Sequence, residues 1–330
     1  MKKTTITLLF TFAMLAGMAV APSAQVFRWK AGESYDAVRV EERIVRQIER
    51  QNQARVAAEI RREVQAATRY RYRHDNNWAS YAGAQVGTDA DPCSNNRHGD
   101  SDYQQHCEVR ESTMGAGPLN VDAGQNGGIV IEGWDGDGIR VRAVVQGSAS
   151  SAARAKAIVD QVQVQVGGGR VYATGPDLER REWWSVSYRI NVPRKNDLDL
   201  HASNGGISIA GVNGNMRFDT VNGGVKLDDV GGRVNGETRN GGLSVTLSGD
   251  RWDGEGLDVE TSNGGVTLRL PENYNAELET RTVNGGLSID FPVTVQGELT
   301  ARRGLSTTLG SGGPLVRVRT TNGGVKIGRR

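Results

Sequence analysis

Three acidic residues, Asp219, Glu237 and Glu260, each stand three positions before a recurring Asn-Gly-Gly sequence. If the recurring segments stack as β-strands, these carboxylates form a row with a spacing of about 4.8 Å, close enough to perturb one another's pKa. Paired carboxylates of this kind supply the acid–base chemistry of polysaccharide lyases and hydrolases. Arg281 and Arg319 continue the row. We therefore favour the alternative of a solvated charged ladder.

Other patterns in the sequence offer little further chemistry. Asp135 and Asp137 lie in an Asp-Gly turn that lacks the additional oxygen ligands of a calcium loop. The sequence has no serine-nucleophile motif and no phosphate-binding glycine loop. We expect no catalytic residues, no cofactor and no metal. The alternative function is a polysaccharide-active β-helix enzyme, a lyase or a hydrolase, that uses the outward acidic residues.

The two cysteines, Cys93 and Cys107, have thirteen residues between them. In an exported chain an even pair of cysteines predicts a disulfide. Closing a loop of this length stabilises the fold by about 3 kcal/mol in the chain-entropy model. The alternative is a zinc site that adds His98 and His106. The adjacent His106 and Cys107 fit no standard zinc spacing, so we favour the disulfide.

The element that must position the acidic row is a repeat in the second half of the chain. Its corner is Asn-Gly-Gly followed by an aliphatic residue, and Arg302–Ser306 is a worn copy. With that copy included, successive intervals are 18, 18, 23, 21, 18 and 20 residues. A period near twenty indicates a stack of coils. The corner residues are Asn204, Gly205, Gly206, Asn222, Gly223, Gly224, Asn240, Gly241, Gly242, Asn263, Gly264, Gly265, Asn284, Gly285, Gly286, Asn322, Gly323 and Gly324.

Apolar residues alternate with polar ones on both sides of each corner. Val225 and Leu227 flank the polar Lys226, for example, and Phe218 and Thr220 precede the same corner. This period of two predicts strands with one buried face and one wet face. Asn and Gly suit the corner because both tolerate positive φ.

These features together predict a mainly β fold, a right-handed parallel β-helix (β-solenoid). An antiparallel all-β sandwich is the alternative, because Asn-Gly also forms hairpins. A hairpin does not explain the fixed period. The wet face of the coils repeats Ser, Thr and Lys, which suits contact with a glycan or an envelope protein.

The chain before the repeat divides into three segments. Residues 1–24 read as a signal peptide, with a basic start, an apolar stretch too short for a comfortable span and small residues before the cut. Residues 25–73 form a charged α-helical segment and 74–118 a loop-rich linker with one disulfide, followed by the β-solenoid domain at 119–330. We therefore expect an exported protein of the periplasm or cell surface, with no transmembrane segment after signal removal.

The helical segment carries a narrow, interrupted apolar stripe, which suits self-association or lateral packing on the solenoid. At its end, Arg69–His74 interleaves basic and aromatic side chains. This pattern suits a polyanion patch or, as we favour, a helix end paired with the acidic segment that follows. The formal net charge of +2 falls to about zero once the signal is removed. We therefore expect no nucleic-acid partner.

Residues 119–330 resemble a bacterial family of exported domains of unknown function, the putative adhesins. The resemblance rests on Ile131–Asp135, a short helical insert, Ile190–Arg194 leading into Leu198–Leu200, and the serial Asn-Gly-Gly coils with intermediate corners at Gly211–Gly214 and Val230–Gly232. It implies a right-handed parallel β-helix outside the cytoplasm, and it brings no catalytic residues. The expected function is a non-enzymatic, adhesin-like binding or structural module of the cell envelope.

Overall fold

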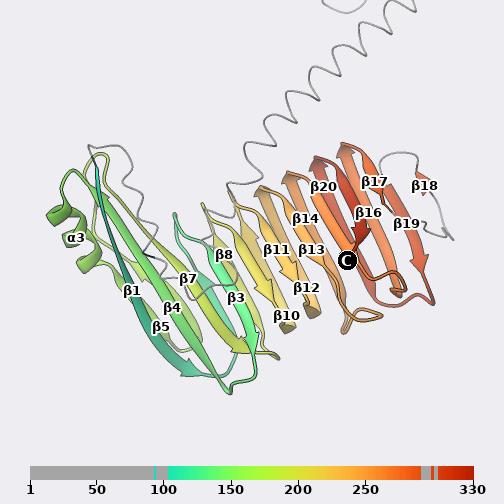
Figure 1. Cartoon of the computed structure of the whole chain (residues 1–330), viewed down its shortest axis with the longest axis horizontal. Helices are drawn as coiled ribbons and strands as arrows, with labels where there is room; N and C mark the ends of the chain where they lie inside the picture. Colours follow the sequence, from blue (N-terminus) through green and yellow to red (C-terminus); the bar gives the residue numbers. More distant parts are fainter. Residues whose placement is uncertain (1–92, 94–102, 291–298, 301–303) are drawn as a thin grey trace, which may run out of the picture. The chain divides into compact units, whose positions relative to one another are not determined.

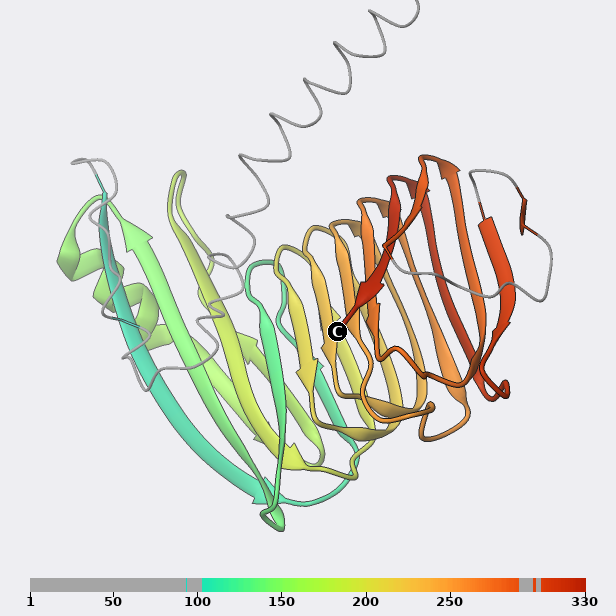
Figure 2. The same cartoon turned by 45° about the vertical axis from the view of Figure 1, so that its right-hand side comes forward.

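The computed structural model describes Cys93 and residues 103–290, 299–300 and 304–330. These residues form two large, mainly parallel sheets packed face to face (Figures 1 and 2). The predicted signal peptide at 1–24, the predicted helix at 25–73 and most of the predicted linker lie outside the described residues. No helix among the described residues is long and apolar enough to cross a membrane.

Sheet A contains the strand that follows each Asn-Gly-Gly corner. Its parallel strands, in spatial order, are β3 (Ile129–Trp134), β9 (Ile207–Ala210), β11 (Val225–Asp228), β13 (Leu243–Thr246), β15 (Val266–Leu270), β21 (Val325–Arg329) and β17 (Leu287–Ile289). Each pairs in register with the next, so that Val225 lies between Ile207 and Leu243.

Sheet B contains the strand that precedes each corner. Its parallel strands, in spatial order, are β2 (Leu119–Asp122), β8 (Leu198–Ala202), β10 (Asn213–Thr220), β12 (Gly231–Asn240), β14 (Gly256–Asn263), β20 (Leu315–Asn322) and β16 (Ala276–Asn284). A coil is therefore one strand of sheet B, a corner, and one strand of sheet A.

The core lies between the two sheets and follows the predicted alternation. In β10 and β11, Met216, Phe218, Val225 and Leu227 are at most 1% exposed, whereas Lys226 between the last two lies on the outer face. The same inward rows continue through the neighbouring coils. The mainly β fold with two sheets rich in parallel pairs is thus confirmed.

At its N-terminal end the stack is extended by antiparallel strands. In sheet A, β7 (Trp183–Pro193) pairs parallel with β3, and β4 (Gly138–Ala149) and β1 (Gln104–Gly115) follow it outward in antiparallel pairs. In sheet B, the hairpin of β5 (Gln163–Gly167) and β6 (Arg170–Thr174) follows β2. The helix α3 (Ala152–Gln161) begins at the N-cap Ser151 and buries Ala155, Ile158 and Val159. It packs against β1 and β4.

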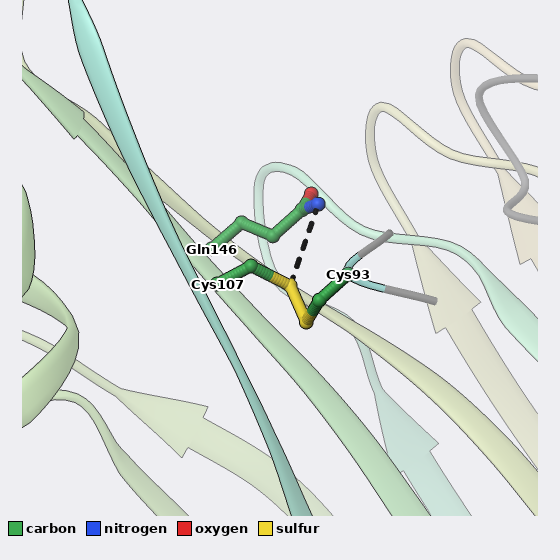
Figure 3. The surroundings of a disulfide bond; sticks show 3 residues. All are labelled: Cys93, Cys107 and Gln146. Carbon is green, nitrogen blue, oxygen red and sulfur yellow. Dashed lines mark hydrogen bonds between the residues drawn. A yellow bond between two sulfur atoms is a disulfide. The ribbon is translucent and has the colours of Figure 1, made fainter. Parts of the chain in front are cut away.

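Strand β1 corrects the prediction that 74–118 is wholly a loop-rich linker. Gln104–Gly115 pairs along its whole length with β4. Its side chains are mostly polar on both faces, which explains why the sequence shows no alternation there. The predicted disulfide is confirmed: Cys107 on β1 is bonded to Cys93 with a Cα–Cα distance of 5.6 Å. Gln146 of β4 lies beside the bond (Figure 3).

The C-terminal end departs from the predicted order of coils. The coil β20–β21 comes latest in the sequence, yet it lies between β14–β15 and β16–β17 (Figure 1). The worn copy at 302–306 does not supply a parallel coil. Residues 301–303 lie outside the described residues, and β19 (Gly304–Leu309) pairs antiparallel with β16. Strand β18 (Leu299–Thr300) pairs antiparallel with β19 and ends sheet B.

Candidate functional site

The corner asparagines form a ladder of side-chain amides along one edge of the coils. Each Nδ2 donates to the Oδ1 of the asparagine in the adjacent coil, at positions that are open to solvent. The bonds run from Asn204 to Asn126 (3.2 Å), Asn222 to Asn204 (2.8 Å), Asn240 to Asn222 (2.9 Å), Asn263 to Asn240 (2.8 Å), Asn322 to Asn263 (2.8 Å) and Asn284 to Asn322 (2.8 Å). The ladder joins seven coils through one repeated contact.

A second ladder lies on the buried side of the corner. In five of these coils a threonine stands two positions before the asparagine and donates its hydroxyl to the carbonyl of the first corner glycine in the adjacent coil. Thr238 bonds the Gly223 carbonyl at 2.7 Å, and Thr261 bonds the Gly241 carbonyl at 2.8 Å. Thr220, Thr320 and Thr282 make the same contact. Because these carbonyls lie against the core, the bonds satisfy groups that water would otherwise have to reach.

The first glycine of the corner is required by close stacking and not by positive φ. A Cβ at Gly241 would lie 2.0 Å from the Gly223 carbonyl oxygen, and equivalent clashes of 1.8–2.1 Å occur at the other repeats. Among the predicted corner residues, all of which are described, only Gly323 has a markedly positive φ, 157°. The explanation from positive φ is therefore wrong for these corners. Successive backbones pass too close for any side chain.

The acidic row predicted on sheet B does lie in register on adjacent coils. Asp219 is opposite Glu237, and Glu237 is opposite Glu260. Arg319 follows Glu260, with 3.1 Å between their charged groups, and Arg281 is next to Arg319. The sequence order of the two arginines is thus reversed in space. Only the middle carboxylate, Glu237, makes none of the ion pairs found among the described residues.

The same row contains a histidine that the sequence did not single out, His201, which lies between Asp122 and Asp219. His201 is opposite Asp219 on β10, and its Nδ1 lies 2.5 Å from the Asp219 carboxylate, while its Nε2 lies 3.1 Å from that of Asp199. Partial burial disfavours the charged imidazolium, but the two carboxylates outweigh it and raise the pKa of His201 above its usual value. The spacing in the sequence could have placed His201 in this row, because it stands three positions before Asn204, as Asp219 does before Asn222.

The outer face of sheet A presents a different row. Ser208, Lys226, Ser244, Thr267, Lys326 and Ser288 lie opposite one another on six adjacent strands. Ser208 is buried, with 7% of its surface exposed, whereas the other five are half-buried or exposed. Beyond Ser208 the row passes Val130 to Arg189 and then Arg142. Lys326 pairs with Asp290 at 2.9 Å and Arg142 with Glu111 at 2.9 Å. The row therefore combines hydroxyl side chains with cationic side chains on one face of the sheet.

Neither row is arranged as a metal centre. Within the described part of the chain, no group of three or more His, Cys, Asp or Glu side chains is placed to hold a metal ion. Among the described residues, most charges of the two rows have an oppositely charged neighbour.

The protein is therefore a two-sheet β-fold. It is built of stacked parallel coils that are joined at glycine corners. The Toastrack DUF4097 family matches residues 118–328, and the chain belongs to this family. No curated protein matches the chain.

Solved structures similar to this chain have low sequence identity to it. One is a "putative cell adhesion protein" from Clostridium sporogenes (11% identity, TM-score 0.38, 68% of this chain and 100% of that one). A second is a "putative adhesin" from Bacteroides fragilis (10%, TM-score 0.27, 68% and 97%). A third is a "putative lipid binding protein" from Parabacteroides distasonis (12%, TM-score 0.24, 68% and 96%). At these TM-scores the likenesses carry no argument about function.

Proposed function

We propose that this chain is an exported, non-enzymatic binding module of the cell envelope, built as a right-handed parallel β-helix. Its binding face is the outer row of sheet A, from Lys226 to Ser288. The proposed layout keeps a signal peptide at 1–24, a charged helix at 25–73 that self-associates or covers the solenoid, a linker from 74, and the family domain to 330. The proposed location is the periplasm or the cell surface.

The observation that carries this proposal is the regular row of hydroxyls and cations on sheet A. Ser244 and Thr267 place hydroxyls on adjacent strands, about 4.8 Å apart. With the lysines on either side they can bond successive hydroxyl or carboxylate groups of an extended polymer. Lys226 and Lys326 contribute positive charge to the row. The chemistry therefore favours an acidic polysaccharide over a neutral one.

The geometry of the acidic row supports a non-enzymatic role. An acid catalyst needs a carboxyl group whose protonation is tuned by burial or by a close second carboxylate. Here Asp219 is held by His201, Glu260 is held by Arg319, and Glu237 is exposed on a flat sheet. This arrangement fits a solvated ladder better than a pair of catalytic groups.

The test is co-sedimentation of the mature chain with an insoluble acidic polysaccharide, calcium alginate, in low and moderate salt. Lys226→Glu combined with Lys326→Glu should lower the bound fraction several-fold, because both changes reverse charges in the proposed row. Arg233→Glu, an exposed charge on the outer face of sheet B, is the matched control and should bind like the parent. Equal binding by all three proteins would contradict the proposal.

The enzyme alternative has its own readout in the same samples. Release of reducing or unsaturated sugar ends that is lost in Glu237→Gln would establish a polysaccharide-active enzyme. We expect no release above background from either protein.

A further inference from the structure

The coil β20–β21 fills a slot whose two walls come earlier in the chain. Strand β20 pairs with β14 on one side and with β16 on the other, and β21 pairs with β15 and β17. The coil also completes both ladders, since Asn322 donates to Asn263 and accepts from Asn284. The slot is therefore shaped for one strand, an Asn-Gly-Gly corner and a second strand.

The acidic side chains on the outer face of the two walls match the arginines of the coil between them. Arg317 lies between Asp258 and Glu279, at 3.1 Å from the first and 2.8 Å from the second. Arg319 contacts Asp258 at 3.0 Å and Glu260 at 3.1 Å. If β16 instead paired with β14 in the same register, Glu279 would lie beside Asp258, and like charges directly opposite each other are destabilising. In that pairing Arg281 would still face Glu260, so the repulsion concerns the Asp258–Glu279 pair. The walls thus favour a strand that carries arginines two positions apart.

The connection into this coil is short and rich in glycine. Residues Gly310–Pro314 link β19 to β20, and Gly310, Gly312 and Gly313 have φ values of 55°, 77° and 154°. The Asn275 side chain of the wall holds this turn by accepting from the Ser311 backbone N–H at 2.8 Å and from its hydroxyl at 3.0 Å. Two backbone bonds also hold the turn, from the Gly312 N–H to the Leu309 carbonyl and from the Glu277 N–H to the Pro314 carbonyl. Its three glycines are the residues that can absorb a change of backbone conformation if the turn acts as a hinge.

We propose that the slot between β14–β15 and β16–β17 also receives the coil β20–β21 of a second copy of this chain, so that two copies join by exchanging this coil. All contacts within the slot are the same whether the coil comes from the same chain or from another one. Exchange of an identical element is a low-cost route to a dimer. The arginines, the threonine and the asparagine that the slot requires occur together in this coil.

The test mixes two full-length single variants, Glu260→Cys and Arg319→Cys, at high protein concentration under mild oxidation. These positions are opposite each other on β14 and β20. Exchange joins the two chains by a disulfide, which non-reducing electrophoresis detects and peptide mapping assigns to positions 260 and 319. A single chain carrying both substitutions shows that the geometry permits the bond.

The control mixture combines Asp219→Cys with Glu237→Cys. These positions are opposite each other on β10 and β12, and neither strand belongs to the exchanged coil. We expect several-fold more interchain product from the 260/319 mixture than from the control, increasing with protein concentration. Equal yields would overturn the proposal, as would dimers without the 260–319 link. Failure of the double variant to form its intrachain bond would also overturn it.

Discussion

The coils from β8 to β15 and the end from β16 to β21 carry the same corner motif but obey different rules. In the first region each coil stacks on the one before it in sequence, and Thr and Asn ladders repeat from coil to coil. At the end the order is broken, because β20–β21 lies inside β16–β17 and β19 runs antiparallel. The ladders continue unbroken across the change of order.

This difference shows that the residues that form each coil are not the residues that set the order of the coils. The corner, with its stacked glycine, its threonine and its asparagine, allows any coil to stack on any other. Charges on the outer face can then favour one neighbour over another. At the end of the stack, Arg317 and Arg319 favour the observed order because they pair with acids on both adjacent strands.

We expect the largest loss of stability from a substitution at the first corner glycine. Gly241→Ala places a methyl group 2.0 Å from the Gly223 carbonyl oxygen, so the two coils must separate. We expect a loss of about 1–3 kcal/mol in the free energy of unfolding. Gly242→Ala is the matched control, since its methyl group would lie 3.5 Å from the nearest atom, an ordinary contact. Urea denaturation of both variants checks this; similar midpoints would refute the stacking role.

Two buried threonine hydroxyls, one in each region, differ in their hydrogen bonding. Thr238→Val removes the bond to the Gly223 carbonyl and should cost about 1 kcal/mol. Thr280 on β16 is also buried, but its hydroxyl has no hydrogen-bond partner in the structure. Thr280→Val should therefore be neutral or slightly stabilising. Thermal unfolding measures both variants, and an equal loss of stability would contradict the distinction between the two hydroxyls.

If charge helps to order the coils, Arg317→Ala should lower the free energy of unfolding. The change removes the contacts of Arg317 to Asp258 and Glu279, and only Asp258 keeps an arginine partner on this strand, Arg319. Because the arginine is only partly buried, we expect a loss of at most about 1 kcal/mol, reduced by salt. Arg233→Ala, whose pair with Glu255 is exposed and 3.6 Å long, should change stability less. Denaturation at low and high salt measures both variants.

His201 should give the smallest effect, and its sign is fixed by the direction of the pKa shift. The folded-state pKa is raised, so the folded protein binds the proton more tightly than the unfolded chain. The contribution is fully present below the unfolded pKa near 6.5 and is lost as pH rises through the folded value. His201→Gln should remove this decline from the plot of denaturation midpoint against pH. An unchanged slope would show that His201 does not contribute.

Much of the fold could be predicted because the coils repeat. Alternation placed the inward rows, the period placed the corners, and the spacing of Asp219, Glu237 and Glu260 placed them on adjacent strands. The segment Gln104–Gly115 could not be recognised as a strand because its side chains are polar on both faces.

The order of the last two coils was hidden for another reason. Both carry the same corner, so spacing alone cannot show which of them lies beside β14. The role of the first glycine was hidden as well, because close backbone approach leaves no mark on sequence beyond the glycine itself. For the candidate binding face, the sequence predicted a repetitive wet face of Ser, Thr and Lys, and its continuation to Arg189 and Arg142 required the strand pairing.

The order of the coils is tested most directly by two double cysteine variants of the full chain. Glu260 lies opposite Arg319 in the structure, and Arg281 is one strand further away. Under mild oxidation, Glu260→Cys with Arg319→Cys should form an intrachain disulfide, while Glu260→Cys with Arg281→Cys should retain two free thiols. The reverse result would mean that the coils stack in sequence order, and it would contradict the placement of β20–β21 between β14–β15 and β16–β17.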